Sequence, residues 1–98
     1  MIVVYILKSH RRGKKFDAIV NGEKVISFGA EGMEDFTIHK DEERKNRYIK
    51  RHEKREDWGN AYSAGFYSRW LLWNKPTLKE SVEDLNKRFH NYHFVLRL

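Results

Sequence analysis

AYSAGFYSRWLLWNKPTL, residues 61–78, holds five of the 14 aromatic residues of the chain and therefore the largest apolar surface that folding must hide. Four of its rings recur at intervals of four, four and three residues, which places them on one face of a helix. These rings belong to Tyr62, Phe66, Trp70 and Trp73. Small and aliphatic residues line the other side, so we expect the helix to be nearly surrounded, with its rings against a sheet. Core packing is the favoured role of the rings, and a platform for stacking nucleic-acid bases is the alternative.

The length of the chain fits one small domain, residues 1–98, with a modest hydrophobic core. The sequence contains no cysteine, which excludes disulfides and thiolate metal ligands and favours an intracellular setting. No apolar run approaches the length of about 18 residues that a membrane helix needs, and basic residues follow the apolar N-terminus rather than precede it. We therefore expect no signal peptide, no membrane contact and no cofactor.

The first third of the chain predicts a β-meander. Residues 1–7 are a β-rich run that is apolar on both faces, as in a strand that is covered on both sides or that pairs at a homodimer interface. Residues 16–20 and 25–28 are the second and third predicted strands. Between them, Asn21 and Gly22 are a strong signal for a type I′ turn, so these two strands form a hairpin.

Three helices and a last strand are predicted to follow. Residues 40–56 are the longest run of good helix formers, with acidic residues in the first turn and basic residues in the last. The aromatic helix comes next and stops before Pro76, and Thr77 with Glu80 is a capping box that opens an amphipathic helix. Residues 92–98 alternate as a strand that can return to the N-terminal sheet. The expected fold is α+β, with the order β-β-β-α-α-α-β and a central aromatic-rich helix packed on a small, mostly antiparallel sheet.

Two stretches of the sequence carry a recognisable pattern. They are residues 28–58, FGAEGMEDFTIHKDEERKNRYIKRHEKREDW, and residues 64–82, AGFYSRWLLWNKPTLKESV. Through them about half of the chain resembles a small family of basic proteins of unassigned function that large nucleocytoplasmic DNA viruses encode. The resemblance implies a viral protein made in an infected cell, in the cytoplasmic viral factory or in the virion. It implies no activity and no catalytic or binding residues.

Positive charge is concentrated in two segments that contain no acidic residue. The net charge is +6, although residues 16–39 hold five acidic residues against Lys24 alone. Residues 8–15 and residues 44–51 each hold five positive charges and no negative one. Such a distribution predicts one basic surface that contacts phosphates. With Lys40 added, the predicted nucleic-acid contacts are Lys8, Arg11, Arg12, Lys14, Lys15, Lys40, Arg44, Lys45, Arg47, Lys50 and Arg51.

The charge pattern favours a non-enzymatic protein that binds nucleic acid through phosphates, with a role in genome packaging. The expected partner is double-stranded DNA without sequence preference, because phosphate contacts carry no base information. One alternative is a structural virion or interaction protein whose basic face meets acidic protein. Another is a metal-dependent nuclease-like enzyme, and the simplest is a solvated helix face without any ligand.

Tyr48 and His52 lie one helical turn apart and Arg44 and Arg51 flank them, which is the strongest suggestion of an active site. His39, Lys40 and Asp41 precede this group, but the spacing of His39 and His52 with one intervening Asp matches no nuclease or zinc motif. A metal-dependent nuclease also normally needs clustered carboxylates. We therefore expect Tyr48 and His52 to pack against the core, and we predict no catalytic residue and no metal ligand.

Arg69 is the only charged residue of the aromatic stretch from residue 61 to Asn74. A guanidinium within an apolar helix needs a carboxylate, backbone carbonyls or an aromatic face as its partner. We expect an ion pair rather than a phosphate contact, and the candidate partners are Glu34, Asp35 and Asp57.

Overall fold

The computed structural model describes residues 1–98, and its centre is a sheet of four strands in the order β3-β2-β1-β4. The strands are β1 (Ile2–Lys8), β2 (Lys14–Val20), β3 (Lys24–Ala30) and β4 (Tyr92–Leu96). The β1–β2 and β2–β3 pairs are antiparallel, whereas β4 runs parallel to β1. The predicted α+β class and the pairing of the two ends of the chain are confirmed, and the sheet is mixed.

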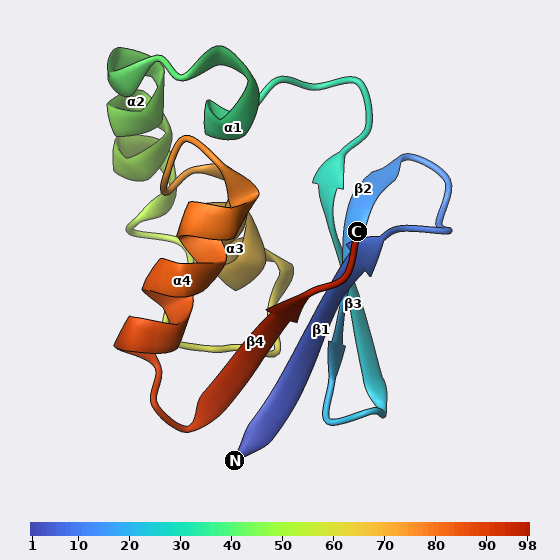
Figure 1. Ribbon diagram of the computed structural model, residues 1–98. Helices are drawn as coiled ribbons and strands as arrows, with labels where there is room; N and C mark the ends of the chain where they lie inside the picture. Colours follow the sequence, from blue (N-terminus) through green and yellow to red (C-terminus); the bar gives the residue numbers. More distant parts are fainter.

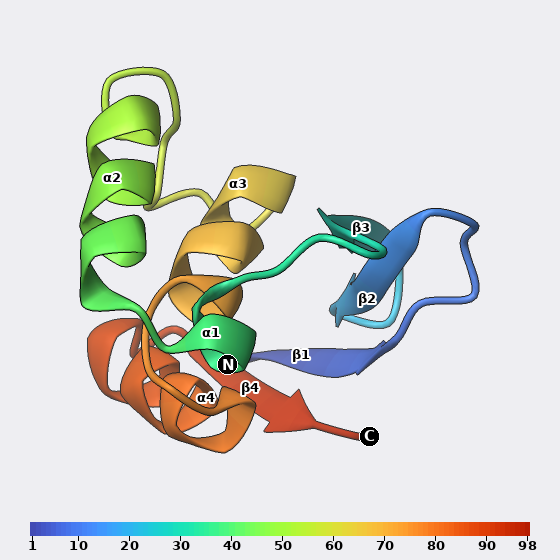
Figure 2. The same ribbon diagram turned by 90° about the horizontal axis from the view of Figure 1, so that it is seen from above.

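The helices all lie on one side of this sheet, and its other face carries none (Figures 1 and 2). The chain passes through α1 (Phe36–His39), α2 (Glu42–His52) and α3 (Ala64–Tyr67), which continues directly into one π-helical turn, η1 (Ser68–Leu72). The last helix is α4 (Leu78–Arg88). None of the helices is long and apolar enough to cross a membrane.

The predicted type I′ turn between β2 and β3 is present. Asn21 and Gly22 both have positive φ angles, of 55° and 70°, and the Glu23 amide donates a hydrogen bond of 3.1 Å to the Val20 carbonyl. Only Gly and, less readily, Asn and Asp tolerate such a conformation, so this turn sets the register of the hairpin.

The single helix predicted over residues 40–56 is wrong at both ends, because α2 covers only Glu42–His52. Lys40 has a φ of 55° and ends the short helix α1, so the chain turns before α2 begins. Asp41 then caps α2, because its carboxylate accepts hydrogen bonds from the amides of Glu43 and Arg44. Lys40 therefore lies outside the basic helix. The local sequence is compatible with a helix that starts at Lys40 and with a left-handed residue that ends α1 there. The N-cap formed by Asp41 favours the second arrangement.

The aromatic helix is shorter than predicted, and a different set of rings faces the sheet. It begins at Ala64 because the Ser63 hydroxyl accepts the Phe66 amide proton, which leaves Tyr62 outside the helix and 47% exposed. Phe66 and Tyr67 are both fully buried. The expected face of Tyr62, Phe66, Trp70 and Trp73 is therefore wrong.

A π turn explains the change of face further along this helix. The Trp73 amide donates to the carbonyl of Ser68, five residues back, at 3.0 Å. The extra residue in the turn shifts the helical phase, so Leu71 and Leu72 both point into the core. Trp70 lies at the edge of the core and Trp73 beside α2, as described below.

The core lies between the inner face of the sheet and the helices. Val4, Ile6 and Phe94 are almost fully buried on the sheet side, where they meet Phe66 and Tyr67. The Phe28 and Tyr67 rings stack with centroids 5.4 Å apart, and the Tyr67 hydroxyl donates to the Ala61 carbonyl at 2.7 Å. A buried tyrosine is therefore both packed and hydrogen-bonded, as its polar end requires.

Arg69 finds partners other than the predicted carboxylates of Glu34, Asp35 and Asp57. Its Nη1 donates to the Trp73 carbonyl at 2.8 Å, and its guanidinium carbon lies 4.5 Å from the centre of the Trp70 ring. The expected ion pair is wrong, because the guanidinium is held instead by this carbonyl, by the Trp70 ring and by the Trp58 ring, whose centre lies 5.3 Å away. Burial, together with the charge of a neighbouring arginine, lowers the pKa of Arg69.

Helix α4 fixes the edge strand β4 through one amide side chain. The predicted capping box holds the start of α4, since the Glu80 amide donates to Thr77 Oγ1 at 3.2 Å and the Thr77 hydroxyl donates to Glu80 at 2.9 Å. Two turns later, Asn86 Nδ2 donates to the Phe94 carbonyl at 3.0 Å, and Asn86 Oδ1 accepts from the Phe94 amide at 2.8 Å. The side chain thus imitates a neighbouring strand.

Replacing Asn86 with Ala should lower the free energy of unfolding by about 1–3 kcal/mol, because both backbone groups of Phe94 lose their partner. Chemical denaturation measures the loss, and hydrogen exchange should show faster exchange at the Phe94 amide. Lys87→Ala, one residue along on an exposed position, is the control. Equal stability of the two variants would contradict the role of Asn86.

Candidate nucleic-acid interface

Helix α2, which carries most of the predicted contacts, is held to the molecule by an aromatic stack. Tyr48 is its buried residue, at 7% exposure. The Tyr48 ring stacks on Trp73 with centroids 4.5 Å apart and planes 4° from parallel, and His52 stacks on it at 4.2 Å. Burial and the charge of Glu56 raise the pKa of Tyr48, so its phenol stays protonated. The predicted packing of Tyr48 and His52 is confirmed.

One face of α2 is a stripe of arginines. Arg44, Arg47 and Arg51 are spaced three and four residues apart, so they line one side of the helix over about 10 Å. Together with the Trp73 ring they line a hollow of about 270 Å³. Arg44 Nη1 lies 3.2 Å from Glu34 Oε1, but both side chains are well exposed, which makes the pair weak. We call these three residues the arginine stripe.

Arg47, Lys50 and Arg51 are exposed and take part in none of the four ion pairs of the molecule. The acidic residues of α2 are confined to its first turn, where they favour the helix dipole. The far part of the helix is therefore positive without a carboxylate of its own, and the acidic residue that lines the adjoining hollow is Glu34, which pairs with Arg44.

A larger cleft, of about 480 Å³, opens between α2, α3 and the ends of β2 and β3. Arg51 lines it from one side and Lys14 from the other. Three acidic residues also line it, and all are engaged: Asp35 pairs with Lys15 and Glu34 with Arg44. The third is Glu56, since His52 Nδ1 lies 3.2 Å from its carboxylate and the Trp58 indole donates to it at 2.9 Å. The cleft is the place where the two basic segments meet.

Lys15 is not available to a ligand, although it belongs to the basic segment of the sequence. Its Nζ lies 2.5 Å from Asp35 Oδ2, with the two side chains only 14% and 4% exposed. Asp35 also accepts the Thr37 amide proton at 2.9 Å and so caps α1. The pair joins β2 to α1 and has a structural role.

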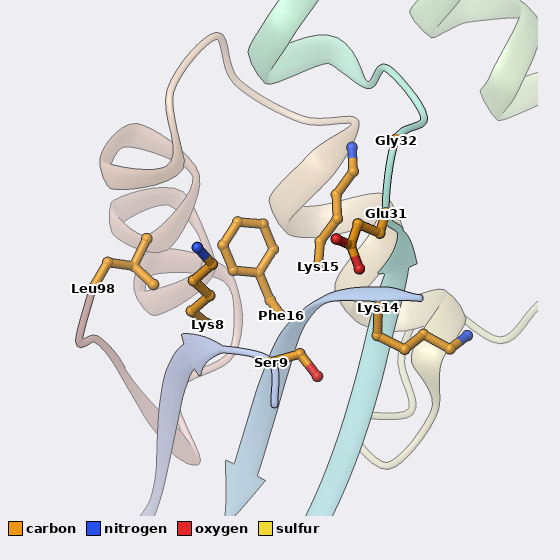
Figure 3. Close-up of a pocket in the computed structure, with 8 residues that line it drawn as sticks. All are labelled: Lys8, Ser9, Lys14, Lys15, Phe16, Glu31, Gly32 and Leu98. Atoms are coloured by element: carbon orange, nitrogen blue, oxygen red, sulfur yellow. The ribbon is translucent and has the colours of Figure 1, made fainter. Parts of the chain in front are cut away.

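The loop between β1 and β2 carries the second group of predicted contacts. Arg11, Arg12 and Lys14 are exposed, and Lys14 lines a hollow of about 480 Å³ together with Lys8. Figure 3 shows Lys14 extending away from Lys8, so the lysines do not converge on one point. Glu31 enters from the end of β3, and its carboxylate accepts the Gly13 amide proton at 3.3 Å.

The structure divides the predicted contacts into engaged and free cations. Four are engaged: Lys15 with Asp35, Arg44 with Glu34, Lys40 through a 2.9 Å hydrogen bond to the Thr37 carbonyl, and Lys45 4.9 Å from the centre of the Phe36 ring. Burial lowers the pKa of Lys45. The remaining seven cations, which make none of these contacts, are Lys8, Arg11, Arg12, Lys14, Arg47, Lys50 and Arg51.

The free cations form two patches rather than one. In both views the loop between β1 and β2 lies at one end of the molecule and α2 at the other (Figures 1 and 2). Only Lys14, Lys15 and Arg51 come together, across the cleft. The expectation of one basic surface therefore holds only at this narrow meeting point.

Sequence reasoning did not locate two residues of the interface, Trp73 and His39. Trp73, assigned to the core face of a helix, lines the hollow of the arginine stripe, and no sequence signal reveals the π turn that places it there. His39 lies 5.3 Å from the Trp73 ring, and its Nδ1 accepts the Asp41 amide proton at 2.9 Å. No group of three or more His, Asp or Glu side chains that could hold a metal ion occurs in the molecule.

Lys15→Met should destabilise the protein by about 3 kcal/mol, because it leaves the Asp35 carboxylate buried without a cation while the aliphatic stem is kept. Thermal unfolding at neutral pH measures the effect. Lys14→Met, at the exposed neighbouring position, is the control and should change stability little. A Lys15 variant as stable as this control would show that the pair is not structural.

Comparison with known proteins gives one match. Residues 4–52, half of the chain, match the model of a family described as "Family of unknown function (DUF5754)". The match runs from β1 to the end of α2 and includes all the predicted contacts, but not the aromatic helix, α4 or β4. No curated protein and no solved structure matches the chain. The chain therefore belongs to the DUF5754 family, whose function is unknown.

Proposed function

We propose that this protein is a non-enzymatic nucleic-acid-binding protein that contacts phosphates. The observation that carries the proposal is the far part of α2, where Arg47, Lys50 and Arg51 are exposed, adjacent and without an acidic partner. Guanidinium groups bind phosphate oxygens well, because their planar donors match two oxygens at once.

The spacing of the arginine stripe suits a nucleic-acid backbone. One strand of a duplex rises about 3.4 Å per phosphate, so the stripe's length of about 10 Å corresponds to roughly three phosphates. The longest dimension of the molecule is 35 Å, comparable with one turn of a duplex at about 34 Å, so the protein is large enough to make contacts along one such turn. Double-stranded DNA without sequence preference is the proposed partner.

The biological setting is a separate part of the proposal, because it rests on the resemblance of the sequence to viral proteins. On that ground we place the protein in the viral factory or the virion of an infected cell, with a role in genome packaging. The main alternative is an interaction protein whose basic patches bind acidic protein. A nuclease-like enzyme is less favoured, because no cluster of metal-binding side chains supports it.

The proposal predicts a strong dependence of affinity on salt. If about five phosphates are neutralised, the logarithm of the binding constant should fall with that of the salt concentration at a slope of roughly −4 to −5. Changing Arg47, Lys50 and Arg51 together to Gln should reduce the size of this slope by about 2.7, or about 0.9 for each lost contact. Fluorescence anisotropy with a random-sequence duplex measures both slopes.

The matched control changes Lys75, Lys79 and Lys87 to Gln, because these lysines are equally exposed and lie in or beside α4. This control removes the same charge and should leave most of the slope in place. No binding by the wild type at low salt would end the proposal, as would equal effects of the two triple variants. Competition by polyglutamate that is as strong as competition by DNA would favour the acidic-protein alternative.

A further inference from the structure

The face of the sheet that no helix covers carries an apolar row across all four strands. In the registered pairs Tyr5 lies opposite Ile19 on one side and opposite Val95 on the other, and Ile19 lies opposite Val25. Paired residues in neighbouring strands point to the same side of a sheet, so these four side chains form one line. The alternate residues, such as Val4 and Val20, are the buried ones, which places the row on the outer face.

This outer face is open to solvent. Figure 2 shows the helices on one side of the sheet and none beyond its other face. Tyr5, Ile19 and Val95 are half-buried, and Val25 at the end of the row is 55% exposed. Apolar side chains lined up on an uncovered sheet are typical of a surface that another protein covers.

Two charges of opposite sign flank the row, and neither has an ionic partner. Asp17 lies opposite Leu7 on one side of β1, and Arg97, whose amide donates to the Ile6 carbonyl at 2.8 Å, lies on the other side. One oxygen of Asp17 accepts hydrogen bonds from the hydroxyls of Ser9 and Ser27, both at 2.7 Å. The Arg97 guanidinium carbon lies 4.5 Å from the centre of the Tyr5 ring.

We propose that this face binds a second copy of the chain, sheet against sheet, about a twofold axis parallel to β1. Under such an axis, a residue of one copy and its counterpart in the other lie at the same height along β1. The β2 side of one sheet then faces the β4 side of the other. It therefore sets Asp17 of each copy against Arg97 of the other and forms two equivalent ion pairs. Tyr5 meets its own counterpart on the axis, and Ile19 meets Val95.

The pattern of charges favours a second copy over a different partner. A twofold interface must be complementary to itself, and one acid and one base at equal distances on either side of the axis meet that condition. An axis across the strands would instead set Asp17 against Asp17 and Arg97 against Arg97. Strands of the two sheets would be nearly aligned, which is the common arrangement of packed sheets. The helices, including the arginine stripe, stay on the outside.

Charge reversal tests the proposed pairing. Sedimentation equilibrium of nucleic-acid-free protein at several concentrations should show a reversible monomer–dimer equilibrium. Arg97→Asp should raise the dissociation constant by about tenfold or more, because the carboxylate introduced in each copy then faces Asp17 of the other copy. The double variant Asp17→Arg with Arg97→Asp should recover an affinity close to that of the wild type, because it restores both pairs with their signs exchanged.

Lys87→Asp is the matched control, because it changes the charge equally on α4, away from the sheet's outer face, and should leave the dimer intact. If the double variant does not fold, as judged by circular dichroism, the dissociation constants of the Arg97→Asp and Lys87→Asp variants still test the proposal, because only the first should rise. A wild type that stays monomeric at every concentration, which leaves the face to a different partner, would overturn the proposal. So would a dimer that Arg97→Asp does not weaken.

Discussion

The stacking of Tyr48 on Trp73 is the interaction on which the basic interface depends. Helix α2 is polar over most of its surface, and Tyr48 is its only buried residue. A helix with so little apolar surface gains little from general burial, so the position of its arginines depends on where one ring binds. The two rings are nearly parallel, at 4°, and His52 continues the stack. The arginine stripe lies beside Trp73 for this reason.

The position of Trp73 depends in turn on the π turn of η1. A regular α-helix would keep Trp73 in phase with Phe66 and Trp70, on the side of the helix predicted to face the sheet. The hydrogen bond from its amide to Ser68 adds one residue to the turn and rotates the indole toward α2. Its carbonyl is then free to accept from Arg69, which also stacks on Trp70. This single π turn therefore places Leu71 and Leu72 in the core and Trp73 beside the arginine stripe.

Features set by neighbouring residues were predictable from the sequence, and features set by distant contacts were not. The Asn21-Gly22 turn, the Thr77–Glu80 capping box and the alternating strands depend on residues close in sequence, and all were predicted correctly. Lys15 forms an ion pair with Asp35, twenty residues away. Counting charges along the sequence could not show that this pair makes the lysine unavailable to a ligand. The stop at Lys40 and the π turn are local, but the residues around each are also compatible with a regular helix.

The proposed dimer would also change the distribution of basic charge. An axis parallel to β1 preserves the direction of every strand, so the loops between β1 and β2 of both copies emerge at the same end, with the sheets about 10 Å apart. Each loop carries Arg11, Arg12 and Lys14 without acidic partners, and the pairing doubles the positive charge there. In this dimer, repulsion between the loops would oppose association, whereas phosphates bound across both loops would neutralise it. The proposed dimerisation and the proposed nucleic-acid binding would therefore strengthen each other, and linkage requires the two effects to be of equal size.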